Sequence, residues 1–168
     1  CLLDSDDIFL PEKVTEIVKV FTNYPDCSWG FHPLHYTSDT FVVDKNNSIS
    51  VKTYDLRSYF KLGNVRGKLP SIIPATSGLC FRRSFLELVL PMPEAEGIST
   101  NDHYLKYTAF AFCKGLTINQ KLGILRLHQE NACTGKKNNS LINSMLIVIN
   151  AYWMRIKFPS LSKYTNNQ

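Results

Sequence analysis

The chain has 168 residues, of which 44% are hydrophobic and 20% charged, and its formal net charge is +5. This length is typical of one domain, and the hydrophobic content is enough for an ordinary globular core. The longest apolar run, residues 145–153, is too short to span a bilayer. Because the basic residues are dispersed, the positive charge fits an anionic substrate or membrane surface and argues against a nucleic-acid partner.

The cysteines exclude two further classes of protein. Five are present, and none forms a Cys-x-x-Cys pair. Scattered cysteines in odd number indicate reduced thiols rather than a disulfide framework or a zinc site. We therefore expect a cytoplasmic protein.

The first feature along the chain is an acidic loop. Leu2 and Leu3 predict the end of a buried strand, and Asp4, Asp6 and Asp7 follow at once. Carboxylates this close raise one another's pKa unless a cation lies between them. Hard oxygen ligands suit Mg²⁺ or Mn²⁺, which proteins often hold together with substrate phosphates. The position after a strand is also where open α/β sheets bind ligands. The alternative is a solvated turn whose aspartates cap the next helix.

A helix and a long irregular stretch follow. Pro11 is placed to begin a helix over residues 12–21, with one apolar face. That predicted face consists of Val14, Ile17, Val18 and Phe21. Residues 23–74 then hold most of the prolines and many aromatic residues, with probable strands at 40–43 and 49–51 separated by a turn.

The second half of the chain begins with more regular signals. Residues 74–84 predict a loop, a short strand and the start of a helix that stops before Pro91. A longer helix is expected over about 100–114, with Ser99 as its N-cap and Gly115 in the C-cap position.

Two short strands and a final helix complete the predicted elements. The strands are expected at 116–118 and 122–127, and the helix at 141–158. An ordinary core helix is the first interpretation of this last segment, and a peripheral membrane contact through it and Lys157 is the alternative. Its predicted inner side consists of Ile142, Met145, Leu146, Ile149, Trp153 and Ile156.

Four side chains outside the acidic loop are candidates for chemistry. Asp102 lies in the first turn of its predicted helix, where the helix dipole favours an ionised carboxylate. Arg126 and His128 follow a strand and are two residues apart, so they point to the same side. Arg82 adjoins a small-residue turn and could bind phosphate. Taken singly, each also has an ordinary interpretation as a dipole-stabilising, surface or solvated residue.

Taken in order, these features form a recognisable series. The segments 3–13, 78–84, 101–105 and 125–131 resemble the family 2 glycosyltransferases of the GT-A fold. The opening acidic motif with its trailing Pro11 and the ending Arg126, His128, Asn131 carry most of the resemblance. The resemblance implies an α/β protein with a Rossmann-related mixed sheet and flanking helices. It also implies an inverting, metal-dependent transfer of sugar from a nucleotide-diphosphate sugar to a saccharide or lipid-linked acceptor.

The same resemblance implies a role for each candidate residue. Asp4 and Asp6 match the family's DxD motif, in which Asp6 would bind Mn²⁺ or Mg²⁺ and Asp4 would lie near the ribose. Asp102 matches the general base, and His128 matches the histidine that closes over the metal or the diphosphate. Neighbouring Asp7, Arg82 and Arg126 would join the nucleotide-sugar site.

Two departures from the family pattern stand out. Asn101 occupies the position where the family usually has glutamate, which affects acceptor positioning more than the base itself. The family's amino-terminal strands, which hold the nucleotide, do not precede the DxD motif. We therefore expect residues 1–168 to be a single domain, the catalytic and acceptor half of such an enzyme. We expect weak or absent activity from such a fragment alone.

Two competing interpretations remain at this stage. Phosphatases of the haloacid dehalogenase type also place Asp-x-Asp after an apolar strand, but they usually continue with Gly-Thr or Gly-Val rather than Asp7 and Ile8. The other alternative is a non-catalytic carbohydrate- or partner-binding fragment that stacks sugars on the aromatic residues of its middle section. Aromatic residues at this density more often form core. Metal dependence would distinguish the enzyme from the binding fragment, since stacking needs no cation.

Overall fold

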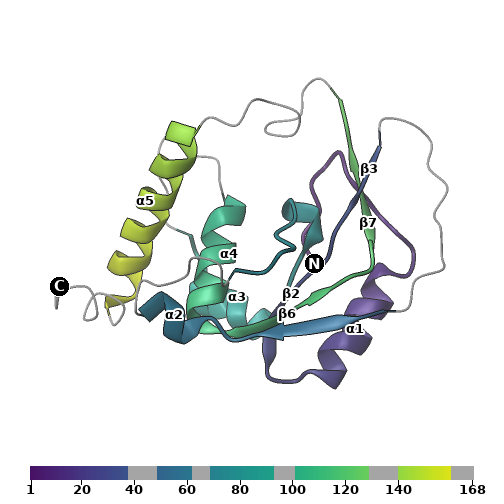
Figure 1. Cartoon of the computed structure of the whole chain (residues 1–168), viewed down its shortest axis with the longest axis horizontal. Coiled ribbons are helices and arrows are strands. Elements are labelled where there is room, and N and C mark those ends of the chain that lie inside the picture. The colour runs from purple at the N-terminus through teal and green to yellow at the C-terminus, as the bar shows by residue number, and fades with distance from the viewer. Residues whose placement is uncertain (38–48, 62–68, 93–100, 129–139, 160–168) are drawn as a thin grey trace.

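The computed structural model describes residues 1–37, 49–61, 69–92, 101–128 and 140–159. These residues form two mixed β-sheets flanked by helices (Figure 1). The predicted fold class, a mixed α/β protein, is confirmed, and the arrangement is consistent with part of a GT-A-like fold. No helix within the described ranges is long and apolar enough to cross a membrane.

The larger sheet has four strands in the order β4-β6-β2-β5. Its two central strands, β2 and β6, run parallel, and each pairs with an antiparallel strand at the edge. The strands predicted within 74–84 and at 116–118 correspond to β5 and β6, whereas the one predicted at 49–51 shares only Val51 with β4. The bounds of the four strands are β2 (Cys27–Phe31), β4 (Val51–Tyr54), β5 (Leu79–Phe81) and β6 (Lys114–Ile118).

The smaller sheet has three strands in the order β1-β7-β3. Its central strand β7 pairs antiparallel with β1 and parallel with β3. In this sheet β1, which follows the acidic loop, pairs with β7, which ends shortly before His128. The bounds are β1 (Ile8–Phe9), β3 (His35–Thr37) and β7 (Gly123–Arg126).

The first helix is where it was predicted, and Ile17 and Phe21 of its predicted apolar face contact the core, but the buried face is rotated away from Val14 and Val18. α1 spans Lys13–Asn23, and its buried residues are Lys13, Ile17 and Val20. Val14 and Val18 of the predicted apolar face are 55% and 58% exposed. The correction has a physical reason, because the buried Lys13 ammonium donates a hydrogen bond to the Ser77 carbonyl and so sets the rotation of the helix.

The helix before Asp102 and the helix that contains it also match their predictions with small shifts. α3 spans Arg83–Val89 and α4 spans Asn101–Phe112. The prediction that Gly115 caps α4 is wrong, because Gly115 lies inside β6. A Cβ atom there would come within 1.9 Å of the Trp29 ring, so the glycine serves close packing rather than helix termination.

Two further helices pack on the α4 side. α2 spans Arg57–Lys61 and α5 spans Ser140–Lys157. Of the inner residues predicted for α5, Ile149 and Trp153 are half-buried, but Ile156 is 61% exposed and that part of the prediction is wrong. Met154 and Asn150 are buried instead.

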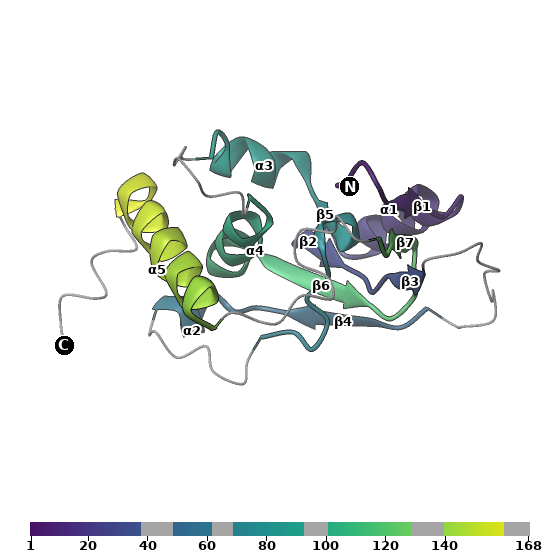
Figure 2. The same cartoon turned by 90° about the horizontal axis from the view of Figure 1, so that it is seen from above.

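The core is divided between the two faces of the larger sheet. One cluster joins β2, β5, α3, α4 and α5 around Trp29, Phe31 and Phe110. The other joins α1 to the opposite face of β2 and β6 through Ile17 and Leu116. Seen from above, α3, α4 and α5 lie to the left and α1 lies to the right with the smaller sheet (Figure 2).

One further prediction is wrong, and others concern residues outside the described part of the chain. Leu2 and Leu3 are not part of a strand: Leu2 N–H donates to the Leu79 carbonyl at 3.0 Å, and Leu3 is 49% exposed. The expected strand at 40–43, the Ser99 cap and Asn131 lie outside the described residues. Four of the cysteines are free thiols, as predicted, and Cys133 also lies outside the described part.

Candidate active site

The acidic loop is held by backbone hydrogen bonds at the carboxyl end of β2. The N–H of Asp4 donates to the Ser77 hydroxyl at 3.0 Å, in the short helix η1 (Thr76–Gly78). The N–H of Asp7 donates to the Asp4 carbonyl at 3.1 Å and closes the turn. One Asp7 carboxylate oxygen accepts the N–H of Arg126 at 3.1 Å. These contacts fix the loop between η1 and the end of β7.

Asp6 and His128 meet although they are 122 residues apart in the chain. His128 Nε2 lies 2.7 Å from Asp6 Oδ2. This hydrogen bond, with the nearby charges of His128 and Arg126, lowers the pKa of Asp6 below its ordinary value. The His128 side chain is 40% exposed and the Asp6 side chain 37%, so both remain accessible to a ligand.

Asp4 connects this loop to the amino end of α4. Burial raises the pKa of Asp4, a hydrogen bond with Thr76 lowers it, and the negative charges of Asp7, Asp6 and Asp102 raise it further, for a net increase. The charge of Asp102 therefore acts on the acidic loop from a distant part of the chain. Of the effects that raise the pKa of Asp4, the charge of Asp102 is the smallest.

Asp102 itself is kept ionised. Burial raises its pKa, but His103 Nδ1 at 3.0 Å from Oδ1 and Lys106 Nζ at 2.7 Å from Oδ2 together outweigh burial, and its pKa lies well below the ordinary value. Lys106 is itself buried. A carboxylate held in this way is charged at neutral pH and has a fixed orientation, which are two requirements for a general base.

A buried lysine supports the loop from below. Lys13 is fully buried, and its ammonium donates to the Ser77 carbonyl at 2.5 Å and lies 3.6 Å from the centre of the Phe9 ring. Burial lowers the pKa of Lys13 to about 8. Because Ser77 also receives the Asp4 N–H, Lys13 holds the residue that anchors the DxD motif.

His32 lies at the same end of β2 and is neutral. It is fully buried, and its Nδ1 donates to the Pro33 carbonyl at 2.8 Å. Burial, and the nearby positive charge of Lys13, lower the pKa of His32 to about 4 despite that hydrogen bond. Its Nε2 atom has no hydrogen-bond partner among the described residues.

The structure does not bring Arg82 to the acidic loop. Its guanidinium donates to the carbonyls of Cys27 at 2.8 Å and Phe21 at 2.6 Å, at the amino end of β2. It also stacks on the Phe21 ring at 5.0 Å. The phosphate-binding role predicted for Arg82 therefore has no support in this geometry, because the side chain is used to join the end of α1 to the larger sheet.

The donors at the loop fit a divalent ion that is shared with a substrate. Within the described part of the chain, no group of three or more His, Cys, Asp and Glu side chains is arranged to hold a metal. Asp6 and His128 alone present two facing ligand atoms, with Asp4 and Asp7 beside them. Mg²⁺ is commonly bound through one or two carboxylates, with substrate phosphates completing its shell. Two facing ligand atoms are too few to hold an ion by themselves, so an ion here would need substrate phosphates to complete its shell.

Three residues of this region were missed from the sequence. Lys106 carried a usable signal, because it lies four residues after Asp102 on one helix face. Lys13 and His32 carried none, since a lysine in a first helical turn and a histidine in an irregular segment are both ordinarily exposed. Their burial depends on the packing of η1 against the end of β2.

Comparison with known proteins gives a distant relative. A protein of Nostoc sp. (strain PCC 7120) described as an uncharacterized glycosyltransferase is 28% identical over 131 residues, which are 77% of this chain. The matched region is 39% of that protein's own length. No protein-family profile matches the chain, and no solved structure matches it at a significant level. The chain therefore has distant similarity to a glycosyltransferase over part of that protein's length.

Proposed function

We propose that this chain is the catalytic and acceptor part of a family 2 glycosyltransferase that is metal-dependent and inverting. The observation that carries the proposal is the meeting of Asp6 and His128 at 2.7 Å, next to Asp4, whose pKa the charge of Asp102 helps to raise. These residues come from three separate segments that resemble motifs of that family. The similarity to the Nostoc protein supports the same activity class.

The proposed reaction needs a base for the acceptor. A sugar hydroxyl is a poor nucleophile near neutral pH, so Asp102 accepts its proton as the oxygen attacks the anomeric carbon. His103 and Lys106 keep Asp102 charged before that step and hold both of its oxygens in place. Its low pKa makes it a weak base. Proton transfer then follows bond formation, when the attacking oxygen has become acidic.

The leaving nucleoside diphosphate develops negative charge, which the acidic loop cannot stabilise alone. Asp6 and His128 would hold Mn²⁺ or Mg²⁺, which supplies Lewis-acid stabilisation of that charge when bound. Arg126 adds a positive charge near Asp6. Asp4 and Asp7 shape the loop around the nucleotide sugar, and attack from the face opposite the leaving group inverts the anomeric carbon.

Calorimetric titration of UDP and GDP, each with and without Mn²⁺, tests the proposal. We expect one nucleotide to bind only with Mn²⁺, and Asp6→Ala to abolish that binding. Asp26→Ala is the matched control, because Asp26 is 81% exposed and lies at the opposite end of β2. It should bind as the unchanged chain does.

Two results would contradict the proposal. One is nucleotide binding that needs no metal or survives Asp6→Ala, which would show that the acidic loop is not a metal site. The other is no binding of either nucleotide by the chain, which would show that these residues do not make a diphosphate site by themselves.

A further inference from the structure

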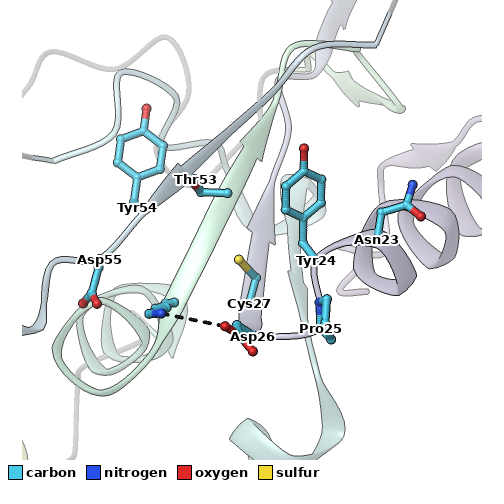
Figure 3. Close-up of a pocket in the computed structure, with 9 residues that line it drawn as sticks. Asn23, Tyr24, Pro25, Asp26, Cys27, Thr53, Tyr54 and Asp55 are labelled. Carbon is cyan, nitrogen blue, oxygen red and sulfur yellow. Dashed lines mark ion pairs between the residues drawn. The ribbon is translucent and has the colours of Figure 1, made fainter.

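A hollow with a mixed polar and apolar lining lies at the other end of the larger sheet from the acidic loop, where the parallel strands β2 and β6 begin. It has a volume of about 560 Å³, within the range of small-molecule sites, roughly 300–1,000 Å³. Three segments build it: the turn after α1, the end of β4 and the start of β6 (Figure 3). Its lining residues are Asn23, Tyr24, Pro25, Asp26, Cys27, Thr53, Tyr54, Asp55 and Lys114.

The charges in this hollow are balanced. Lys114 Nζ lies 3.8 Å from Asp26 Oδ2. Asp55 is paired just outside the hollow with Arg57, which donates to its two oxygens at 2.8 and 2.6 Å. Two carboxylates therefore face two cations, and the site has little net charge to attract an ion. It offers hydrogen-bond donors and acceptors side by side.

The walls combine these polar groups with tyrosine rings. In Figure 3, Tyr24 and Tyr54 stand on either side of Thr53 and Cys27. Tyr54 is a fixed wall, because its ring stacks with Trp29 at 6.2 Å between centroids. Tyr24 is 36% exposed and is available to a ligand.

The turn that carries Tyr24 is held in place before any ligand arrives. The Arg82 guanidinium donates to the carbonyls of Phe21 and Cys27, which lie on either side of the turn. The Tyr24 N–H donates to the Val20 carbonyl at 3.0 Å. A pre-formed wall lowers the entropy lost on binding.

We propose that this hollow binds a neutral saccharide, at a site separate from the acidic loop. A sugar presents apolar C–H faces that pack on an aromatic ring, and hydroxyl groups that both donate and accept hydrogen bonds. The lining combines polar and apolar surface, as a sugar does, and the paired charges suit neither a free cation nor an anion. The proposal does not depend on the transferase activity, because a non-catalytic protein could carry the same site.

NMR titration of the isotope-labelled chain tests the proposal, with neutral trisaccharides of glucose, galactose, mannose and N-acetylglucosamine as probes. We expect at least one of them to shift the amide signals of residues 23–27, 53–55 and 114. Tyr24→Ala should weaken that binding by about tenfold or more. Tyr152→Ala is the control, since Tyr152 is 63% exposed on α5. Asp26→Asn should also weaken binding, and it tests the site independently if Tyr24→Ala fails to fold.

Other outcomes would overturn the proposal. The absence of shifts with all four trisaccharides would do so, as would binding unchanged in both Tyr24→Ala and Asp26→Asn. Shifts of the same residues by spermidine in place of the sugars would identify a cation site. Shifts confined to residues 4–7 and 102–106 would assign the sugar to the acidic loop, which would support the proposed transferase and reject the second site.

Discussion

The charged residues at the two ends of β2 lie in different environments. At the amino end, Asp26 and Asp55 are exposed and each has a cationic neighbour. At the carboxyl end, the negative charges of Asp6 and Asp7 help to raise the pKa of Asp4, and Lys13 is buried against the Ser77 carbonyl. Exposed pairs cost little to assemble and contribute little to stability. Buried or crowded ionisable groups cost stability and are typical of functional sites.

The two regions contain similar types of residue, and they differ more in the pKa values of those residues. Both ends have aspartates, a lysine and aromatic rings. Among the described residues, burial lowers the pKa of Lys13 to about 8 and that of His32 to about 4, and both lie near the carboxyl end. Substitutions at both ends can test whether sugar transfer and the pH dependence of stability depend on residues near the carboxyl end.

The largest effect is expected from Asp102→Asn. The amide cannot accept the proton of the acceptor, so sugar transfer should fall by about 10²–10⁴-fold. Binding of the Mn²⁺ complex of the nucleotide should change little, because Asp102 is not placed among the metal ligands. A transfer assay with the responsive nucleotide sugar and the titration described above measure the two quantities.

Loss of stability has to be separated from loss of the base. Asp102→Asn leaves the buried Lys106 without its carboxylate, which should cost roughly 3 kcal/mol of stability. The double variant Asp102→Asn/Lys106→Met should regain much of that stability and remain inactive. An active double variant would exclude Asp102 as the base.

Lys13 should make stability rise in alkaline solution. Its pKa of about 8 in the folded chain lies below the ordinary 10.5, so between these values the unfolded chain binds more protons. The free energy of unfolding should therefore increase from pH 8 to pH 10.5, by up to roughly 3 kcal/mol. Urea unfolding at a series of pH values measures this. Lys13→Met should remove the increase, and an unchanged profile would show that Lys13 is not buried as a titrating group.

His32 should have a comparable effect in acid. Its folded pKa of about 4 lies below the ordinary 6.5, so the unfolded chain takes up the proton first as the pH falls. Stability contributed by neutral His32 is complete above pH 6.5 and is lost between 6.5 and 4. His32→Gln should flatten this part of the profile. Should the variant keep the same acid loss, the loss would have to come from other groups.

The smallest effect is expected at the amino end. Asp26→Asn removes one partner of a 3.8 Å ion pair whose side chains are 81% and 44% exposed. The free energy of unfolding should change by less than about 1 kcal/mol at neutral pH. Thermal unfolding at low and high salt measures this. A larger or strongly salt-dependent loss would contradict the contrast drawn between the two ends.

Much of the secondary structure could be predicted because its signals are local. The apolar spacing located α1, α4, α5, β6 and β7 to within a few residues, since hydrophobic periodicity depends on neighbours in the chain. The rotation of α1 could not be predicted in the same way. Its inward face follows from the Lys13 contact with Ser77, which is 64 residues away.

Most of the candidate site could be named from motifs, but its geometry could not. The order of Asp6, Asp102 and His128 in the chain indicated which side chains to consider together. The structure brings His128, which follows β7, to Asp6, and Asp102 lies in the first turn of α4. The position of the Arg82 side chain could not be predicted from its local sequence. Its guanidinium had nearer carbonyl acceptors at the end of α1, and nothing in its local sequence revealed them.

By itself, the sequence determined the α/β class, the positions of most helices and strands, and the acidic residues from which a metal-dependent transfer can be argued. The tertiary structure alone decided that Lys13 and His32 are buried, that Gly115 packs under Trp29 and that a balanced polar hollow forms at the far end of the sheet. The reason is that hydrogen bonds, burial and shifted pKa values arise between segments distant in the chain, whereas sequence patterns report mainly on neighbours.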